Sequence, residues 1–113
     1  MSSPVMTIQT FAVLRTMLDD PDAEWYGLDL SKRSGLRPGT IYPMLNRLLN
    51  AGWLERRWEE IDPTLEGRPR RRLYLLTRVG APAARRALTE HRASLAGLNP
   101  PKPIRPRARP RPA

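Results

Sequence analysis

Hydrogen-bond donors suited to a polyanion are concentrated in two short segments of this sequence. Polar side chains recur at helical spacing within residues 40–50, and four arginines fall in five positions within residues 67–72. Asparagine pairs with adenine, arginine pairs with guanine or phosphate, and hydroxyl groups donate to phosphate oxygens. These segments are therefore candidates for contact with double-stranded DNA, through Thr40, Tyr42, Pro43, Asn46, Arg47, Arg68, Arg70 and Arg71.

The sequence offers little for catalysis or metal binding. It contains no cysteine and a single histidine, which excludes disulfides, a cysteine nucleophile and thiolate or histidine-rich metal sites. No nucleophile is accompanied by a base, and no paired carboxylates lie in an apolar setting. Gly35 and Gly39 lack the flanking strand that a phosphate-cradling loop requires. We therefore expect no enzyme, no cofactor, and no catalytic or metal-binding residues.

The charge of the chain is strongly asymmetric. The formal net charge is +9 and the pI is about 11.3. Residues 1–66 hold seven basic and ten acidic residues, a net charge of −3, whereas residues 67–113 hold thirteen basic residues and one acidic residue, a net charge of +12. Such a localised basic excess favours contact with nucleic acid over a uniformly solvated surface.

Helices joined by a glycine turn are predicted in the first half of the chain. A helix over residues 6–18 is followed by a short second helix, which Trp25-Tyr26-Gly27 opens. It runs from Leu28 to Lys32 or Arg33, with Leu28 facing the core. The turn over residues 34–39 contains two glycines and a proline, which cannot continue a helix. A third helix over residues 40–50, with Pro43 in its first turn, carries an apolar stripe of Ile41, Leu45, Leu48 and Leu49. This spacing is typical of a helix-turn-helix, whose second helix enters the major groove.

A β-hairpin is predicted after the third helix. Residues 53–60 and 71–76 alternate between apolar and polar side chains, which is the period of half-buried strands. We expect Leu54, Trp58, Leu73 and Leu75 to face the core and Glu59 to face outward. The connection over residues 61–70 is expected to be a long loop, whose arginines flank a proline and could enter a narrow minor groove. The alternative is a charged hairpin that merely prevents edge pairing.

The last predicted helix suits contact with a second subunit. It spans about residues 78–98, with regular helix beginning near Ala81 because Pro82 fits only the first turn. Its heptad-like seam has steps of four and three residues and consists of Ala84, Leu88, His91, Leu95 and Leu98. Residues 99–113 contain six of the 13 prolines and five basic residues, and we expect a disordered or polyproline-like tail.

The order of these elements predicts a mainly α fold with a small β-hairpin (α+β). It is the order of a winged helix-turn-helix, here over residues 1–98, with a C-terminal dimerisation helix. No stretch approaches the ~18 apolar residues needed to span a membrane, and the N-terminus lacks the pattern of a secretory signal. We expect a cytoplasmic, nucleoid-associated protein without a membrane partner.

Several motifs resemble the PadR family of transcriptional regulators. They are YGLDL at 26–30, GTIYPMLNRL at 39–48, AGWL at 51–54 and GRPRRRLYLLT at 67–77, and the similarity covers about residues 7–98. The resemblance implies a homodimeric repressor whose first helix, including Phe11, joins the last helix at the dimer interface. Some members of the family sense small aromatic molecules, so a small-molecule inducer of unknown identity is open for this chain. Trp25, Trp53 and Trp58 are more simply explained as core or edge aromatics.

Two other functions are compatible with the sequence. An architectural DNA-binding protein would use the charge of the hairpin and tail with little base readout, and would bind with a steep salt dependence. A winged helix that serves as a protein-interaction adaptor would present an apolar or acidic face on its third helix. The face predicted here is polar and basic, which makes the adaptor the weaker alternative.

Overall fold

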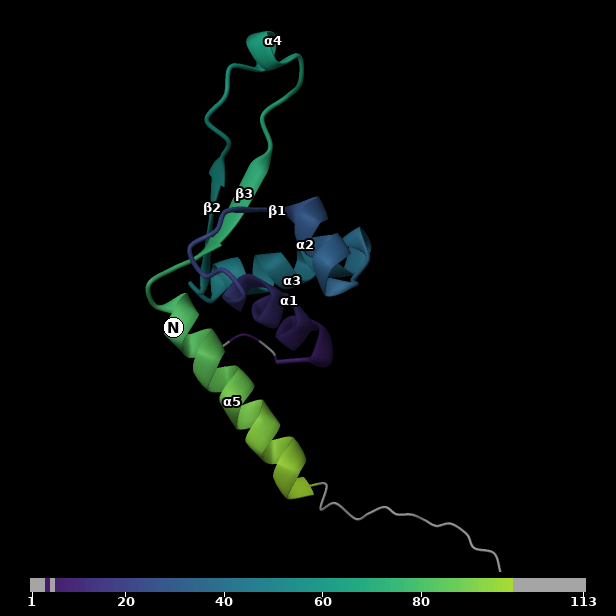
Figure 1. The fold of residues 1–113 in the computed structure, drawn as a ribbon, viewed down its shortest axis with the longest axis vertical. Coiled ribbons are helices and arrows are strands. Elements are labelled where there is room, and N and C mark those ends of the chain that lie inside the picture. The colour runs from purple at the N-terminus through teal and green to yellow at the C-terminus, as the bar shows by residue number, and fades with distance from the viewer. Residues whose placement is uncertain (1–3, 5, 99–113) are drawn as a thin grey trace, which may run out of the picture.

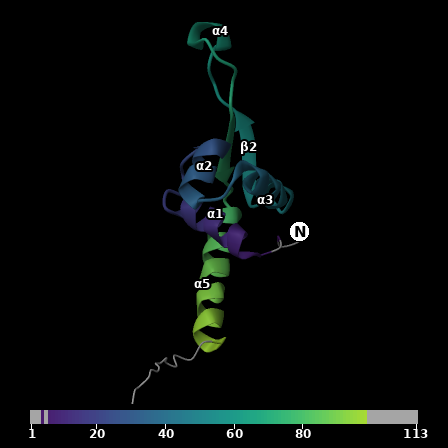
Figure 2. The ribbon, with the colours of Figure 1, turned by 90° about the vertical axis from the view of Figure 1, so that its right-hand side faces the viewer.

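Three helices, a long hairpin and a final helix make up most of the described part of the chain. The computed structural model describes residue 4 and residues 6–98. The elements are α1 (Ile8–Leu18), β1 (Trp25–Tyr26), α2 (Gly27–Ser34), α3 (Pro38–Asn50), β2 (Leu54–Trp58), α4 (Pro63–Glu66), β3 (Arg72–Leu76) and α5 (Gly80–Leu98). In Figure 1, the hairpin of β2 and β3 extends from one side of the α1–α3 cluster, with α4 at its tip. Helix α5 extends in the opposite direction, as Figure 2 also shows.

The α1–α3 cluster is held by one apolar core. Helix α1 begins after Thr7, whose side chain accepts a hydrogen bond from the Thr10 N–H at 3.2 Å, and its Val13, Leu14 and Met17 are fully buried. Helix α3 buries Ile41, Leu45 and Leu48 as its stripe predicts. Trp25 and Trp53 join the same core. Burial of such side chains supplies most of the stabilisation available to a domain of this size.

The turn between α2 and α3 depends on Gly35. This residue ends α2 with a φ of 79°, a left-handed conformation that glycine adopts without a Cβ penalty, and its N–H bonds the Ser31 carbonyl at 3.1 Å. The prediction for Leu28 is wrong, because its side chain is 57% exposed, whereas Leu30 is fully buried. The buried face of α2 consists of Gly27, Leu30 and Ser31, and Leu28 lies outside it.

The sheet has three strands rather than two. Residues 25–26, expected to open the second helix, form β1 instead and pair antiparallel with β3, giving the strand order β1-β3-β2. Tyr74 lies at the centre of the register, opposite Trp25 on one side and Arg56 on the other. A two-residue strand is too short to show a period of its own, and its pairing is made with residues almost fifty positions away.

The predicted facing of the two hairpin strands is partly wrong. Leu54 and Leu73 are buried, but Trp58 is 53% exposed and Leu75 is only half-buried. Tyr74 and Leu76 are the β3 residues that belong to the main core. Both faces of β3 are covered near residues 73–74, so simple alternation does not identify the core side there.

The connection between β2 and β3 contains one helical turn, α4, where a loop was expected. Asp62 caps it by accepting the Thr64 N–H at 3.0 Å, and Gly67 ends it with a φ of 70°. The turn makes the hairpin tip a defined structure rather than an open loop.

Helix α5 is anchored at its first residue. The Thr77 hydroxyl accepts the Gly80 N–H at 2.8 Å and donates to the Gly52 carbonyl at 2.7 Å. Pro82 lies in the first turn, where its missing N–H costs little. Among residue 4 and residues 6–98, no helix is long and apolar enough to cross a membrane. The predicted tail, residues 99–113, lies outside the described residues.

Candidate nucleic-acid interface

The outer face of α3 carries the side chains that the sequence assigned to it. Tyr42, Pro43, Asn46 and Arg47 are exposed, and Thr40 is half-buried. Because α3 begins at Pro38, Pro43 lies in its second turn rather than in its first, and it has no N–H for the carbonyl of Gly39. The exposed face therefore offers a phenol, an amide and a guanidinium along one side of a single helix.

A basic cavity of about 510 Å³ lies beside this face, between α2, α3 and β3. Its lining consists of Tyr26, Gly27, Leu28, Asp29, Lys32, Tyr42, Arg71, Arg72 and Tyr74. The cations at its edge, Lys32 and Arg72, were missed as site residues. Sequence patterns did not identify them, because β3 is brought beside α2 by the pairing of β1 with β3. Phosphate oxygens of a nucleic acid backbone would find three cations within this cavity.

The four arginines within residues 68–72 do not share one role. Arg70 is exposed, and its Nε donates to the Ile61 carbonyl at 3.0 Å. The exposed Arg71 and Arg72 guanidinium groups lie over the rings of Tyr26 and Trp58, with distances to the ring centroids of 4.8 Å and 4.1 Å. Such stacking leaves the guanidinium edges able to donate hydrogen bonds.

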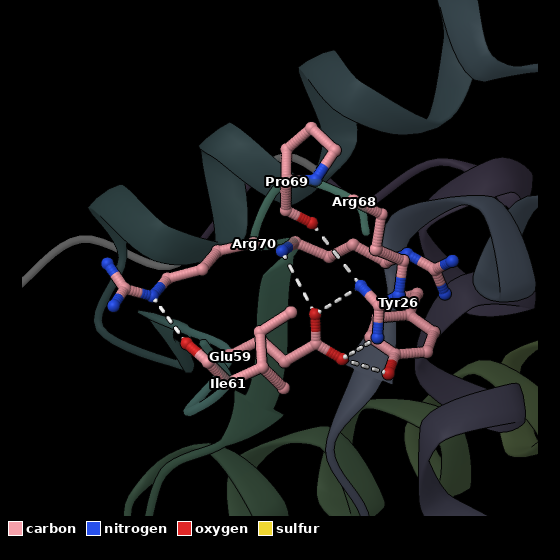
Figure 3. Close-up of polar contacts among 7 residues, drawn as sticks. Tyr26, Glu59, Ile61, Arg68, Pro69 and Arg70 are labelled. Carbon is pink, nitrogen blue, oxygen red and sulfur yellow. Dashed lines mark hydrogen bonds and ion pairs between the residues drawn. The ribbon is translucent and has the colours of Figure 1, made fainter. Parts of the chain in front are cut away.

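Arg68, by contrast, is engaged within the protein. Its NH1 and NH2 atoms donate to Oε1 and Oε2 of Glu59 at 2.7 Å and 3.0 Å, as Figure 3 shows. This forked pair is the strong form of a charge-assisted hydrogen bond. The expectation that Arg68 extends freely toward a minor groove is not met in this arrangement.

Glu59 was expected to face outward, but it is buried with 8% of its surface exposed. Besides Arg68, it accepts the Tyr26 hydroxyl at 2.5 Å and the Arg71 backbone N–H at 3.2 Å. The hydrogen bonds from Arg68 first, and from Tyr26 second, lower the pKa of the Glu59 carboxyl to about 2. The same carboxylate raises the pKa of the Tyr26 hydroxyl, chiefly by accepting its hydrogen bond.

The hairpin tip differs in charge from its base. Residues 59–66 contain four acidic residues and no basic residue. Glu60, Asp62 and Glu66 are exposed there, next to Leu65, which is 82% exposed. Phosphates would be repelled by this tip, so Arg71 and Arg72, which line the cavity beside α2 and α3, are better suited to nucleic acid than α4 is.

A second candidate surface lies between α1 and α5. The rings of Phe11 and His91 stack with centroids 4.0 Å apart and an interplanar angle of 17°. A groove of about 290 Å³ follows this pair and is lined by Ile8, Phe11, Ala12, Arg15, Leu88, His91, Arg92 and Leu95. The residues of α1 that line it belong to the helix face turned away from the core.

The predicted interface residues of α5 divide into three groups. Leu95 is 52% exposed and is available to a partner, as is the half-buried His91. Leu88 is buried beside the groove. Ala84 is fully buried in the core of its own chain, so its assignment to the interface was wrong. The side chain of Leu98 lies outside the described residues.

The residues that the structure describes contain no group of three His, Asp or Glu side chains that could hold a metal ion. The side chains that the candidate interface presents are hydrogen-bond donors and cations.

Comparison with known proteins gives a family and a fold. A model described as the Transcriptional regulator PadR-like family matches residues 21–86, which include α2, α3 and the whole hairpin. Among curated proteins, no significantly similar sequence was found. A PadR family transcription regulator from Clostridium difficile R20291 has a similar structure, with a TM-score of 0.66 and 19% identity over 82% of this chain and 96% of that chain.

Two further solved structures have the same fold. The smu.1704 protein from Streptococcus mutans UA159 has a TM-score of 0.62 and 25% identity over 88% of this chain and 91% of that chain. The PcaV transcriptional regulator from Streptomyces coelicolor has a TM-score of 0.62 and 26% identity over 84% of this chain. Only 62% of PcaV is covered, so the chain spans about three fifths of that regulator's length.

Proposed function

Because this chain belongs to the Transcriptional regulator PadR-like family, we propose that it is a sequence-specific DNA-binding regulator that acts as a dimeric repressor. The observation that carries the proposal is the polar outer face of α3, with Tyr42, Asn46 and Arg47 exposed beside a basic cavity. In a helix-turn-helix, this face enters the major groove. We propose no catalytic role.

In this proposal, α3 reads bases and the surrounding cations hold the backbone. Asn46 and Arg47 suit adenine and guanine, and one bidentate base contact is worth about 1–3 kcal/mol of discrimination. Lys32, Arg70 and Arg71 are placed to meet phosphates, which fix the register of α3 without reading sequence. Tyr42 and Thr40 donate hydroxyl hydrogen bonds to the same backbone.

The proposed dimer is formed by α1 and α5. Phe11, His91 and Leu95 line a partly apolar groove that a second subunit would cover, since α5 extends away from the rest of its own chain (Figures 1 and 2). A two-fold dimer binds a pseudo-palindromic operator whose half-site centres lie ~34–36 Å apart. Bound there, in the cytoplasm at the nucleoid, the dimer would occlude a promoter until a signal, such as a small-molecule inducer, releases it.

The test is selection of bound duplexes from a random library at near-physiological salt. Enrichment of a two-fold-symmetric motif would support the proposal. Arg47→Ala should then lose affinity for the selected motif, whereas Arg85→Ala, which removes an exposed arginine from α5, should not. Binding without enrichment would instead indicate an architectural protein, and failure to bind DNA would indicate a protein-interaction adaptor.

A further inference from the structure

One arginine of the run over residues 68–72, Arg68, is bound within the protein by a carboxylate. Resting on the proposed function, we propose that Glu59 is a positioning residue: it withholds Arg68 from DNA and fixes the hairpin against β1, leaving Arg70 and Arg71 to meet phosphates. Nothing in the sequence distinguishes Arg68 from the neighbouring arginines. The structure distinguishes it, because the Arg68 guanidinium is bound by Glu59.

Both carboxylate oxygens of Glu59 are fully used. Oε1 accepts from Arg68 NH1 at 2.7 Å and from the Arg71 backbone N–H at 3.2 Å. Oε2 accepts from Arg68 NH2 at 3.0 Å and from the Tyr26 hydroxyl at 2.5 Å (Figure 3). Four donors from three residues, which lie in two separate segments, therefore converge on one buried carboxylate.

The pair resists exchange of Arg68 onto a phosphate. Glu59 is buried, so withdrawal of the guanidinium would leave a carboxylate charge without its main partner, which is strongly unfavourable. A phosphate on the solvent side offers Arg68 a weaker replacement, because exposed pairs gain little. Arg70 and Arg71 carry no such restraint, since neither guanidinium is paired with a carboxylate in the described part of the chain.

The same contacts connect the hairpin to the helix-turn-helix. Tyr26 is the last residue of β1 and directly precedes α2, whereas Glu59 follows β2 and Arg68 precedes β3. The Tyr26 ring, fixed by its hydroxyl, also lies under the Arg71 guanidinium at 4.8 Å. Glu59 thereby determines where Arg71 stands relative to α3.

The salt dependence of DNA binding tests this assignment. Each phosphate contact that is lost reduces the slope of log K against log salt by about 0.9. Arg70→Gln should therefore reduce the slope by about 0.9 per subunit. Arg68→Gln removes the withheld charge but keeps Glu59, with its hydrogen bonds from Tyr26 and the Arg71 backbone, and should leave the slope unchanged. A reduction in Arg68→Gln equal to that of Arg70→Gln would overturn the proposal.

Glu59→Gln alone releases Arg68 and should make the slope steeper than that of Glu60→Gln. The latter is the matched control, because it removes the same charge from the neighbouring exposed residue. Equal slopes in these two variants would contradict the withholding of Arg68.

A measurement without DNA separates this inference from the proposed function. In an ultraviolet titration, Glu59→Gln should lower the pKa of the Tyr26 hydroxyl toward its usual value of 10.0, and Tyr26→Phe should remove that high-pH transition. An unchanged tyrosine titration in Glu59→Gln would overturn the positioning role. If the titration shifts as expected but the wild-type chain binds no DNA, only the proposed function fails.

Discussion

The Tyr42 hydroxyl lies directly over Gly27, in the space that any larger residue at that position would occupy. A Cβ built on Gly27 would come within 2.6 Å of the Tyr42 hydroxyl oxygen and 2.7 Å of its Cε1. Gly27, the first residue of α2, therefore packs directly against the Tyr42 ring of α3. The glycine is required by the neighbouring helix, because its own φ is not positive.

Gly27→Ala should disturb DNA binding more than stability. The added methyl group must push the Tyr42 ring outward, and an exposed ring can move at small cost, so we expect the free energy of unfolding to change by less than ~1 kcal/mol. We expect affinity for the selected duplex to fall about tenfold, or ~1.4 kcal/mol. Binding assays on Gly27→Ala, Tyr42→Ala and the double variant check this. Full additivity of the two losses would show that Gly27 does not act through Tyr42.

Acid should destabilise the protein partly through Glu59. The folded-state pKa of about 2 lies below the ordinary value of 4.5, so the carboxylate contributes stability that is fully present above pH 4.5. That contribution is lost as the pH falls from 4.5 toward 2. The Tm of the wild-type chain should therefore fall more steeply over this range than that of Glu59→Gln, and Glu60→Gln should resemble the wild type. Parallel curves for wild type and Glu59→Gln would show that the low pKa is absent in solution.

Leu95→Glu should convert the proposed dimer to monomers with the fold intact. Leu95 is exposed beside the Phe11–His91 pair, so a carboxylate there would be buried only on dimerisation, which is costly. Sedimentation velocity gives the mass, and circular dichroism the fold. Leu65→Glu is the matched control, because Leu65 is also exposed but lies on α4. A dimer that persists in Leu95→Glu would place the interface elsewhere. Leu88 is less suitable, because it is already buried within the monomer.

Gly80→Ala should destabilise the fold. A Cβ on Gly80 would overlap the carbonyl group of Trp53, and backbone atoms cannot move aside as a side chain can. We expect a loss of about 1–3 kcal/mol or more in urea unfolding. Gly39→Ala, where a Cβ meets nothing within 4 Å, should be neutral or stabilising by up to ~1 kcal/mol. Equal stability of the two variants would argue against close packing of α5 on Trp53.

Local patterns predicted the parts of this molecule that depend on local physics. The stripe of α3 and the glycine at the end of α2 follow from helical periodicity and from φ preference, and both were identified with nearly correct boundaries. The exposed Asn46 and Arg47 follow directly, since they lie opposite that stripe. The family resemblance, which rests on the same segments, is confirmed by the match over residues 21–86.

Long-range pairing accounts for what the sequence did not predict. β1 forms because residues 25–26 pair with β3. A segment of two residues has no sequence pattern from which this pairing could be predicted. Burial of Glu59 likewise depends on Tyr26, Arg68 and Arg71 meeting at one point, whereas the alternation of β2 placed it outward. Ala84 fits a heptad-like seam, but the spacing of a seam does not show which of its residues pack into the core of their own chain and which face a partner.

The acidic end of the hairpin gives the molecule an electrical polarity. Carboxylates lie on and beside α4, at the far end of the hairpin from α3 (Figure 1), while Lys32, Arg47 and Arg71 lie on or near α3. In the field of a DNA duplex, such a charge separation exerts a torque that turns α4 away from the phosphates. If α3 enters the groove as we propose, a larger share of encounters with DNA would begin with α3 facing it.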